Sequence, residues 1–85
     1  MASYRLVFKK SVAKDLRAIP AADVARILQC VEALAENPHP VGSEKLSGQE
    51  RYRLRQGNYR ILYEIRDGEL IVVVVKVGHR REVYR

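Results

Sequence analysis

The spacing of apolar residues changes along the first half of the chain, and each spacing predicts a different element. Tyr4, Leu6 and Phe8 alternate with other residues, which is the period of a half-buried strand. From about residue 10 the apolar positions recur at helical spacing, first in a short stripe and then, after Pro20, in a longer one. The first stripe consists of Val12, Leu16 and Ile19, and the second of Val24, Ile27, Leu28, Val31, Leu34 and Ala35.

The second half of the chain predicts strands. Residues 37–48 (NPHPVGSEKLSG) form a connector rich in Pro, Gly and Ser. Alternation resumes in residues 51–55 and 59–66, which are separated by a Gly57-Asn58 turn. Asp67-Gly68 is a two-residue hairpin signal, and residues 70–77 (LIVVVVKV) predict a strand buried on both faces and therefore central in the sheet.

The element order is therefore β-α-α-β-β-β, and the predicted fold class is α+β. A helical hairpin is expected to cover one face of a mainly antiparallel, four-stranded sheet, because each element has one apolar side to bury. The chain shows no repeat and no composition break, so residues 1–85 predict a single domain.

Positive charge is concentrated in the predicted strands. Residues 51–85 contain nine Lys/Arg and four Asp/Glu, which gives +5 of the total net charge of +6. Arg53 and Arg55 share one face of a strand, because side chains two residues apart point the same way. Arg60 follows the adjacent turn and Arg80 follows the apolar strand, so both can join them. Such a cluster of cations predicts a site for a polyanion, with nucleic acid the leading candidate.

Other classes of protein are disfavoured by what the chain does not contain. A single cysteine, Cys30, cannot form an internal disulfide, and no secretory signal or membrane-length apolar run is present. We therefore expect a cytoplasmic protein that does not associate with membranes. No Cys/His spacing or acidic cluster predicts a metal site, and no phosphate-binding loop or dinucleotide-binding motif predicts a cofactor.

Two segments carry candidate chemistry. In residues 52–65 (YRLRQGNYRILYEI), arginines that can bind phosphate oxygens in pairs are interleaved with tyrosines that can stack on bases. In residues 77–84 (VGHRREVY), His79 emerges at a strand end and is a possible proton carrier, although a surface histidine fits equally well. Tyr84 fits either a core or a catalytic position. The candidate RNA-binding residues outside this set are Lys10, Lys14, Arg81 and Arg85.

The segments KLSG, YRLRQGNYRILYEI and VGHRREVYR together resemble the RelE family of bacterial and archaeal toxins, within the RelE/ParE superfamily. The resemblance extends over nearly the whole chain, including the predicted helical hairpin. It implies a microbial-ribonuclease-like fold and a type II toxin that cleaves mRNA in the ribosomal A site without a metal. It also implies three partners, namely the ribosome, mRNA and a cognate RelB-like antitoxin.

Residue by residue, the resemblance assigns catalytic importance to five positions, which are Arg53, Arg55, Arg60, Arg80 and Tyr84. The best-known members carry lysines at the first two positions, and the counterpart of Arg53 has been given a proton-accepting role. Arginine is too basic to serve easily as a general base. Either Tyr84 or His79 therefore accepts the proton here, or Arg53 acts by electrostatics alone.

Two alternatives remain open from the sequence. One is a ParE-like toxin, which shares the fold but poisons DNA gyrase and cleaves no RNA. The other is a non-catalytic module that binds RNA or the ribosome, because binding and weak catalysis require the same arginines.

Overall fold

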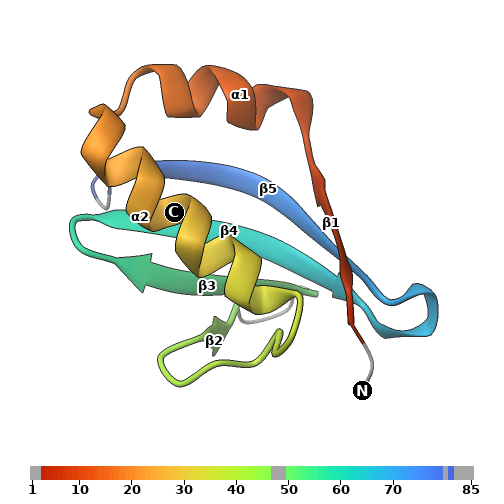
Figure 1. Ribbon diagram of the computed structural model, residues 1–85. Helices are drawn as coiled ribbons and strands as arrows, with labels where there is room; N and C mark the ends of the chain where they lie inside the picture. Colours follow the sequence, from red (N-terminus) through yellow and green to blue (C-terminus); the bar gives the residue numbers. More distant parts are fainter. Residues whose placement is uncertain (1–2, 47–49, 80, 82–85) are drawn as a thin grey trace.

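The computed structural model describes residues 3–46, 50–79 and 81. Its elements form a sheet with the strand order β1-β5-β4-β3-β2, and two helices pack against one face of that sheet (Figure 1). β1 runs parallel to β5, and every other neighbouring pair is antiparallel. In chain order the elements are β1 (Arg5–Phe8), α1 (Lys10–Arg17), α2 (Ala21–Leu34), β2 (Glu44–Lys45), β3 (Arg51–Gln56), β4 (Tyr59–Arg66), the 3-10 helix η1 (Asp67–Glu69) and β5 (Ile71–His79).

The predicted α+β class is confirmed, but the described sheet has five strands where four were expected. The additional strand, β2, lies inside the predicted connector and pairs with the edge of β3. The backbone N–H of Leu46 also donates to the carbonyl of Arg51 at 2.8 Å. Because Glu44 and Lys45 are both exposed, β2 has no apolar alternation, and its strand geometry depends on pairing with β3 alone.

The β3–β4 loop and the β4–β5 connection differ in length and backbone conformation. Gly57 and Asn58 form the two-residue loop between β3 and β4, and Gly57 adopts the positive φ of 58° that tight hairpins require. The predicted two-residue turn at Asp67-Gly68 is wrong in length. The chain instead makes the 3-10 turn η1 and then places Leu70 in the left-handed region with φ 54° before β5 begins.

The helices are placed by their apolar stripes. Val12 of α1 and Ile27, Val31 and Leu34 of α2 are buried, while Lys10, Lys14 and Arg17 of α1 are exposed. Pro20 is the N-cap of α2, where its fixed φ suits a helix start and its missing N–H removes no hydrogen bond. Neither described helix combines the length and apolar character that crossing a bilayer requires.

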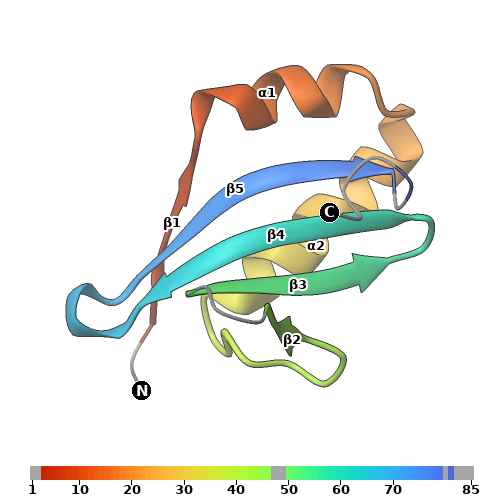
Figure 2. The ribbon, with the colours of Figure 1, turned by 180° about the vertical axis from the view of Figure 1, so that it is seen from behind.

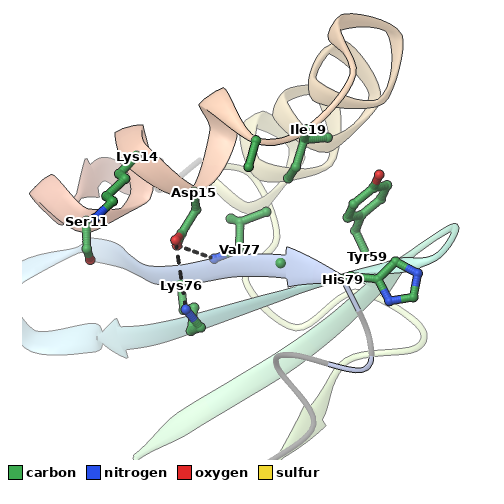
Figure 3. A pocket seen from close by; sticks show the side chains of 10 residues that line it. Ser11, Lys14, Asp15, Ile19, Tyr59, Lys76, Val77 and His79 are labelled. Carbon is green, nitrogen blue, oxygen red and sulfur yellow. Dashed lines mark hydrogen bonds and ion pairs between the residues drawn. The ribbon is translucent and has the colours of Figure 1, made fainter.

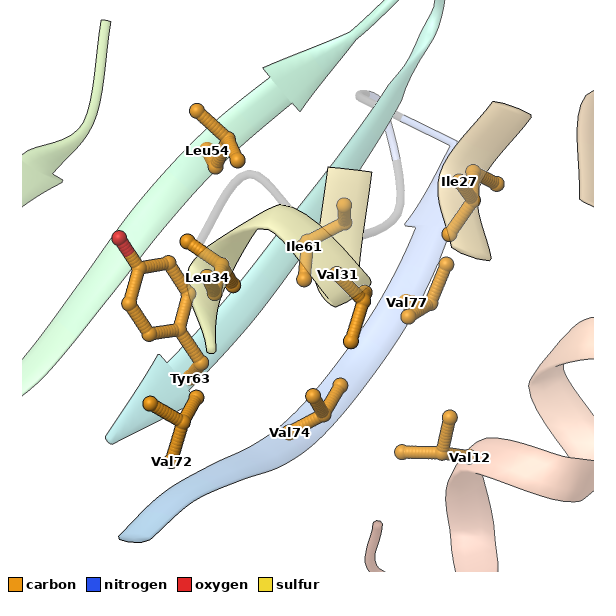
Figure 4. Close-up of a cluster of buried hydrophobic side chains, with 10 residues drawn as sticks. All are labelled: Val12, Ile27, Val31, Leu34, Leu54, Ile61, Tyr63, Val72, Val74 and Val77. Carbon is orange, nitrogen blue, oxygen red and sulfur yellow. The ribbon is translucent and has the colours of Figure 1, made fainter. Parts of the chain in front are cut away.

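One main core lies between the helices and the sheet (Figure 4). Its largest fully buried side chain is Tyr63, whose hydroxyl donates to the carbonyl of Pro38 at 2.9 Å. The buried members of this core are Val12, Ile27, Val31, Leu34, Leu54, Ile61, Tyr63, Val72, Val74 and Val77.

A β-bulge shifts the alternation of side chains along β5, so that Val72, Val74 and Val77 all reach the main core. The register passes from Leu62 opposite Lys76 to Tyr63 opposite Val74, so Val75 has no single partner on β4. Val75 packs instead with Leu62 and with Val73 in a second, smaller apolar cluster. Since Leu62 alternates with the core residues on either side of it, this cluster lies on the face away from α2. Figure 2 views the molecule from that side, with α2 behind the sheet.

Candidate nucleic-acid interface

The strand register brings three of the predicted arginines to one face of the sheet. Arg55 lies directly opposite Arg60 across the β3–β4 hairpin, and Arg53 lies opposite Leu62. Residues directly opposite each other in an antiparallel pair share a face, and so do residues two apart on one strand. Arg53, Arg55 and Arg60 therefore project from the face that the helices leave uncovered, and we call these three residues the arginine row.

The acidic residues near the arginine row neutralise it only in part. Arg53 pairs with Glu44 of β2 at 3.2 Å, but the Glu44 side chain is 67% exposed, so water weakens this attraction. The Nε of Arg55 donates to the carbonyl of Gly57 at a long 3.4 Å. Within the described residues Arg55 has no carboxylate partner. Arg53 and Arg55 therefore keep a positive charge that an anionic ligand can reach.

Two other arginines on these strands have a structural partner. Glu64 accepts from the Nε of Arg51 at 3.1 Å and also lies 3.6 Å from a guanidinium nitrogen of Arg66. Because the Glu64 side chain is only 22% exposed, the two arginines compensate a partly buried carboxylate. Arg51 shares the face of the arginine row but is engaged by this carboxylate.

His79 lies on the opposite side of the sheet from the arginine row. It pairs in register with Tyr59, which alternates with Arg60, and the rings of His79 and Tyr59 meet edge to face at 5.9 Å. The Nδ1 of His79 accepts the backbone N–H of Arg81 at 3.2 Å. A neutral His79 ring in this arrangement therefore carries its hydrogen on Nε2, which is left to act as a donor.

The helix α1 joins β5 through one carboxylate that the sequence did not single out. Asp15 accepts the backbone N–H of Val77 at 3.2 Å through one oxygen, and its other oxygen lies 3.8 Å from the Nζ of Lys76. These contacts fix α1 over the end of β5 next to His79 (Figure 3). Sequence spacing could not reveal this contact, because 62 residues separate Asp15 from Val77.

The two predicted RNA-binding lysines of α1 occupy different surroundings. Lys14 lines a hollow between α1 and the end of β5, together with His79. Lys10 lines a separate, almost wholly apolar groove of about 330 Å³ beside β1. That groove is formed by Phe8, Lys9, Lys10, Val12, Ala13, Leu16 and Leu28.

Part of the predicted site lies outside the described residues, namely Arg80, Tyr84 and Arg85. Arg81 is described and is exposed at a turn after β5. Within residues 3–46, 50–79 and 81, no three His, Cys, Asp or Glu side chains gather closely enough to hold a metal ion.

Three side chains with a raised pKa lie away from the arginine row. Burial raises the pKa of the Cys30 thiol, which donates to the side-chain oxygen of Gln56. Burial also raises the pKa of Tyr63 in the core. The hydrogen bond from Tyr4 to Asp67 raises the pKa of the Tyr4 phenol. All three groups therefore favour their neutral forms and serve as hydrogen-bond donors that hold elements together.

Comparison with known proteins extends over nearly the whole chain. The family model described as "ParE toxin of type II toxin-antitoxin system, parDE" matches residues 6–84. Toxin RelG of Mycobacterium tuberculosis is 31% identical over 86 residues, which cover 96% of this chain and 97% of RelG. In the archaeal RelE–RelB complex of Pyrococcus horikoshii, one chain matches with a TM-score of 0.83 and 30% identity, covering 92% of this chain and 96% of its own length. The RelBE2 complex of M. tuberculosis contains a chain with a TM-score of 0.81 and 27% identity, covering 92% of this chain and 99% of its own length.

Proposed function

Because this chain belongs to the family of ParE and RelE toxins of type II toxin–antitoxin systems, we propose that it is a ribosome-dependent endoribonuclease. It cleaves mRNA in the ribosomal A site and thereby stops translation. The observation that carries this proposal is the arginine row on the uncovered face of the sheet. A nuclease that relies on the ribosome to orient its substrate needs electrostatic stabilisation more than a complete set of acid–base groups.

The reaction is an internal transesterification that requires no metal. The 2′-oxygen of the substrate attacks the adjacent phosphorus, the bond from phosphorus to the 5′-oxygen breaks, and a 2′,3′-cyclic phosphate and a 5′-hydroxyl are formed. One proton leaves the 2′-hydroxyl and one reaches the departing 5′-oxygen. Arg53, Arg55, Arg60 and Arg80 stabilise the dianionic phosphorane, because guanidinium groups bind phosphate oxygens in pairs and stay charged.

The proton transfers are assigned to Tyr84 ahead of His79. His79 lies with Tyr59 on the face of the sheet opposite the arginine row, which disfavours direct contact with a phosphate held there. Arg53 acts by electrostatics, since arginine does not give up its proton at neutral pH. Lys10, Lys14, Arg81 and Arg85 extend the contacts with RNA and with the ribosome around this centre.

A toxin that inhibits DNA gyrase is the second candidate, and the match to the ParE family model favours it. The cations on the uncovered face and the RelE names of the similar toxins favour RNA instead. A protein that binds RNA without cleaving it needs the same cations, so activity has to be measured directly.

Primer extension on a defined mRNA tests these candidates together. The purified protein should leave naked mRNA largely intact and cut it when programmed ribosomes are present. Arg80→Ala should lower the cleavage rate roughly 100- to 1000-fold, the usual effect of removing one electrostatic donor, while ribosome binding persists. Efficient cutting of naked mRNA would contradict ribosome dependence, and inhibition of gyrase supercoiling without any cleavage would establish the second candidate.

The proposed regulator is an acidic, partly disordered RelB-like antitoxin that folds on this basic domain. The net charge of +6 supports an acidic partner. The apolar groove beside β1 supports an amphipathic segment, because Phe8 is 43% exposed there and Lys9 and Lys10 lie at the groove. We expect nanomolar affinity, or about −12 kcal/mol, in a titration of the toxin with the co-encoded partner. Phe8→Ala should weaken this binding, and normal growth during strong expression of the toxin alone would argue against the whole arrangement.

A further inference from the structure

A hollow of about 510 Å³ separates α1 from the carboxyl-terminal end of β5 (Figure 3). This volume is within the range of small-ligand sites. Its polar walls come from α1 and from β5, and Tyr59 of β4 closes one side. The lining side chains other than Ala18, Ile19 and Val77 are Ser11, Lys14, Asp15, Tyr59, Lys76 and His79. We call this hollow the α1–β5 pocket.

The α1–β5 pocket carries a positive charge that its one carboxylate does not cancel. Both oxygens of Asp15 are engaged, one by the backbone N–H of Val77 and the other near Lys76. Lys14 has no ion-pair partner in the part of the chain that the structure describes. Two lysines therefore face one carboxylate, and the surplus cation suits an anionic group such as a phosphate.

Aromatic side chains border the same pocket. Tyr59 and His79 contact each other edge to face, with an angle of 81° between their ring planes. Because Nδ1 of His79 already accepts a hydrogen bond from Arg81, Nε2 is the nitrogen that can donate to a ligand. A cation beside an aromatic ring is the combination that holds a single unstacked nucleotide, with the phosphate on the cation and the base on the ring.

The position of the pocket connects it to the arginine row. Gly78 lies directly opposite Arg60 in the β4–β5 register, and Gly78 also lines the α1–β5 pocket. Since Gly78 carries no side chain, β5 itself presents only backbone opposite Arg60. An RNA strand bound along the arginine row can therefore continue past Arg60 and over the end of β5 into the pocket.

We propose that the α1–β5 pocket is a second nucleotide-binding site for single-stranded RNA, in which Lys14 and Lys76 bind a phosphate and Tyr59 supports a base. The site holds a nucleotide that flanks the one at the arginine row, and it rests on the proposed function in that its ligand is RNA. Its contribution is to anchor and position the strand, so Lys14 and Tyr59 contact a nucleotide that does not itself react.

Binding of a 2′-O-methyl RNA trinucleotide to the full chain, followed by backbone amide NMR, tests the site. The methyl group removes the attacking hydroxyl, so the measurement is independent of cleavage. The amides of Val77 and Gly78 should shift, and Lys14→Gln should weaken binding about threefold to tenfold. The slope of log Kd against log salt should also fall by about 0.7, the amount expected for one lost phosphate contact on a single strand.

Arg17→Gln is the matched control, because it removes the same charge from the same helix and Arg17 does not line the pocket. This variant should keep the wild-type salt slope, and Lys14→Arg should restore binding. Equal loss of affinity in Lys14→Gln and Arg17→Gln would show that the net charge of α1 alone controls RNA binding, and it would contradict the proposed nucleotide site. Shifts at Val77 and Gly78 with the antitoxin but not with RNA would assign the pocket to the antitoxin and overturn it as well.

Failure of the site is distinguishable from failure of the proposed function. If the wild-type protein cuts mRNA on ribosomes but Lys14→Gln binds the trinucleotide as tightly as the wild type, the proposed nucleotide site is wrong and the proposed nuclease activity stands. A wild-type protein that binds the trinucleotide through Lys14 but cuts nothing would leave an RNA-binding site on a non-catalytic protein.

Discussion

The two faces of the β3–β4 hairpin are built from the same two strands, yet one is apolar and buried and the other carries arginines. On the helix side Leu54, Ile61 and Tyr63 are buried in the main core. On the other side, one residue along each strand, Arg53, Arg55 and Arg60 project from a face that no helix covers. A two-residue period can therefore place the core and a cationic surface on opposite faces of one hairpin. Substitutions on the two faces should therefore affect different measurements.

Removing a charge from the arginine row should have the largest effect, and it should be an effect on activity. Arg55→Ala should lower ribosome-dependent cleavage roughly 100- to 1000-fold, or about 3–4 kcal/mol of transition-state stabilisation. Its free energy of unfolding should change by less than about 0.5 kcal/mol, because Arg55 is exposed and has no carboxylate partner in the described residues. Single-turnover cleavage and urea unfolding measure the two quantities.

Arg26→Ala on α2 is the control for lost surface charge, since the Arg26 side chain is 67% exposed and forms an ion pair with Asp23. Cleavage by Arg26→Ala should stay near the wild-type rate. Equal loss of cleavage in both variants would mean that net charge, and not the arginine row, supports activity.

A substitution on the helix side should show the reverse pattern. Ile61→Ala creates a cavity in the main core and should lower the free energy of unfolding by about 3–4 kcal/mol. Leu62→Ala, at the next position and on the other face, should lower it by about 2 kcal/mol, because among the described residues the Leu62 cluster has two other buried members, Val73 and Val75. Urea unfolding of both variants checks the difference, and a larger loss in Leu62→Ala would contradict it.

Much of the fold followed from the sequence because alternation and helical stripes are local. The strands at residues 4–8 and 59–66 and both helices were predicted in this way, and so was the shared face of Arg53 and Arg55. The parallel pairing of β1 with β5 was not predicted, since the period of a strand does not identify its neighbour. The bulge at Val75 was also hidden, because an unbroken run of valines has no alternation to interrupt.

The missed parts of the candidate site share one physical cause. Asp15, Tyr59 and Lys76 come together only because α1 docks on the end of β5. In the sequence Asp15 resembles an ordinary solvated residue on the polar side of a helix, whereas its side chain is only 19% exposed. The placement of His79 opposite the arginine row depended on its register with Tyr59, which requires the three-dimensional sheet.

Loss of one buried hydrogen bond should have a smaller effect than a cavity. Tyr63→Phe removes the hydroxyl that donates to the carbonyl of Pro38 and should lower the free energy of unfolding by about 1–2 kcal/mol. Tyr52→Phe is the matched control, because the Tyr52 hydroxyl makes no hydrogen bond among the described residues. Thermal unfolding of both variants tests this, and a larger loss in Tyr52→Phe would contradict the assignment.

The buried phenol of Tyr63 should also make the stability of the fold depend on pH. Burial raises the pKa of Tyr63 in the folded protein, so folding favours its neutral form. The resulting stabilisation is complete below the unfolded pKa of about 10 and is lost as the pH rises above it. The melting temperature of the wild type should therefore fall more steeply above about pH 10 than that of Tyr63→Phe, and parallel curves would show that another group controls the alkaline transition.

The smallest effect is expected for Arg51, which shares the face of the arginine row and forms an ion pair with Glu64. Arg51 is engaged by Glu64, which Arg66 also approaches, so Arg51→Ala leaves that carboxylate with one cation. A double-mutant cycle between Arg51→Ala and Glu64→Ala should give a coupling of about 0.2–1 kcal/mol, as is usual for a pair that remains partly exposed. Cleavage by Arg51→Ala should change less than about threefold, because the charge of Arg51 is already compensated by Glu64. A tenfold change would mean that Arg51 contributes about 1.4 kcal/mol of transition-state stabilisation. A hundredfold loss of cleavage would show instead that Arg51 acts on the substrate although it is paired with Glu64. An ion pair with a carboxylate would then not distinguish arginines that stabilise the fold from arginines that act on the substrate.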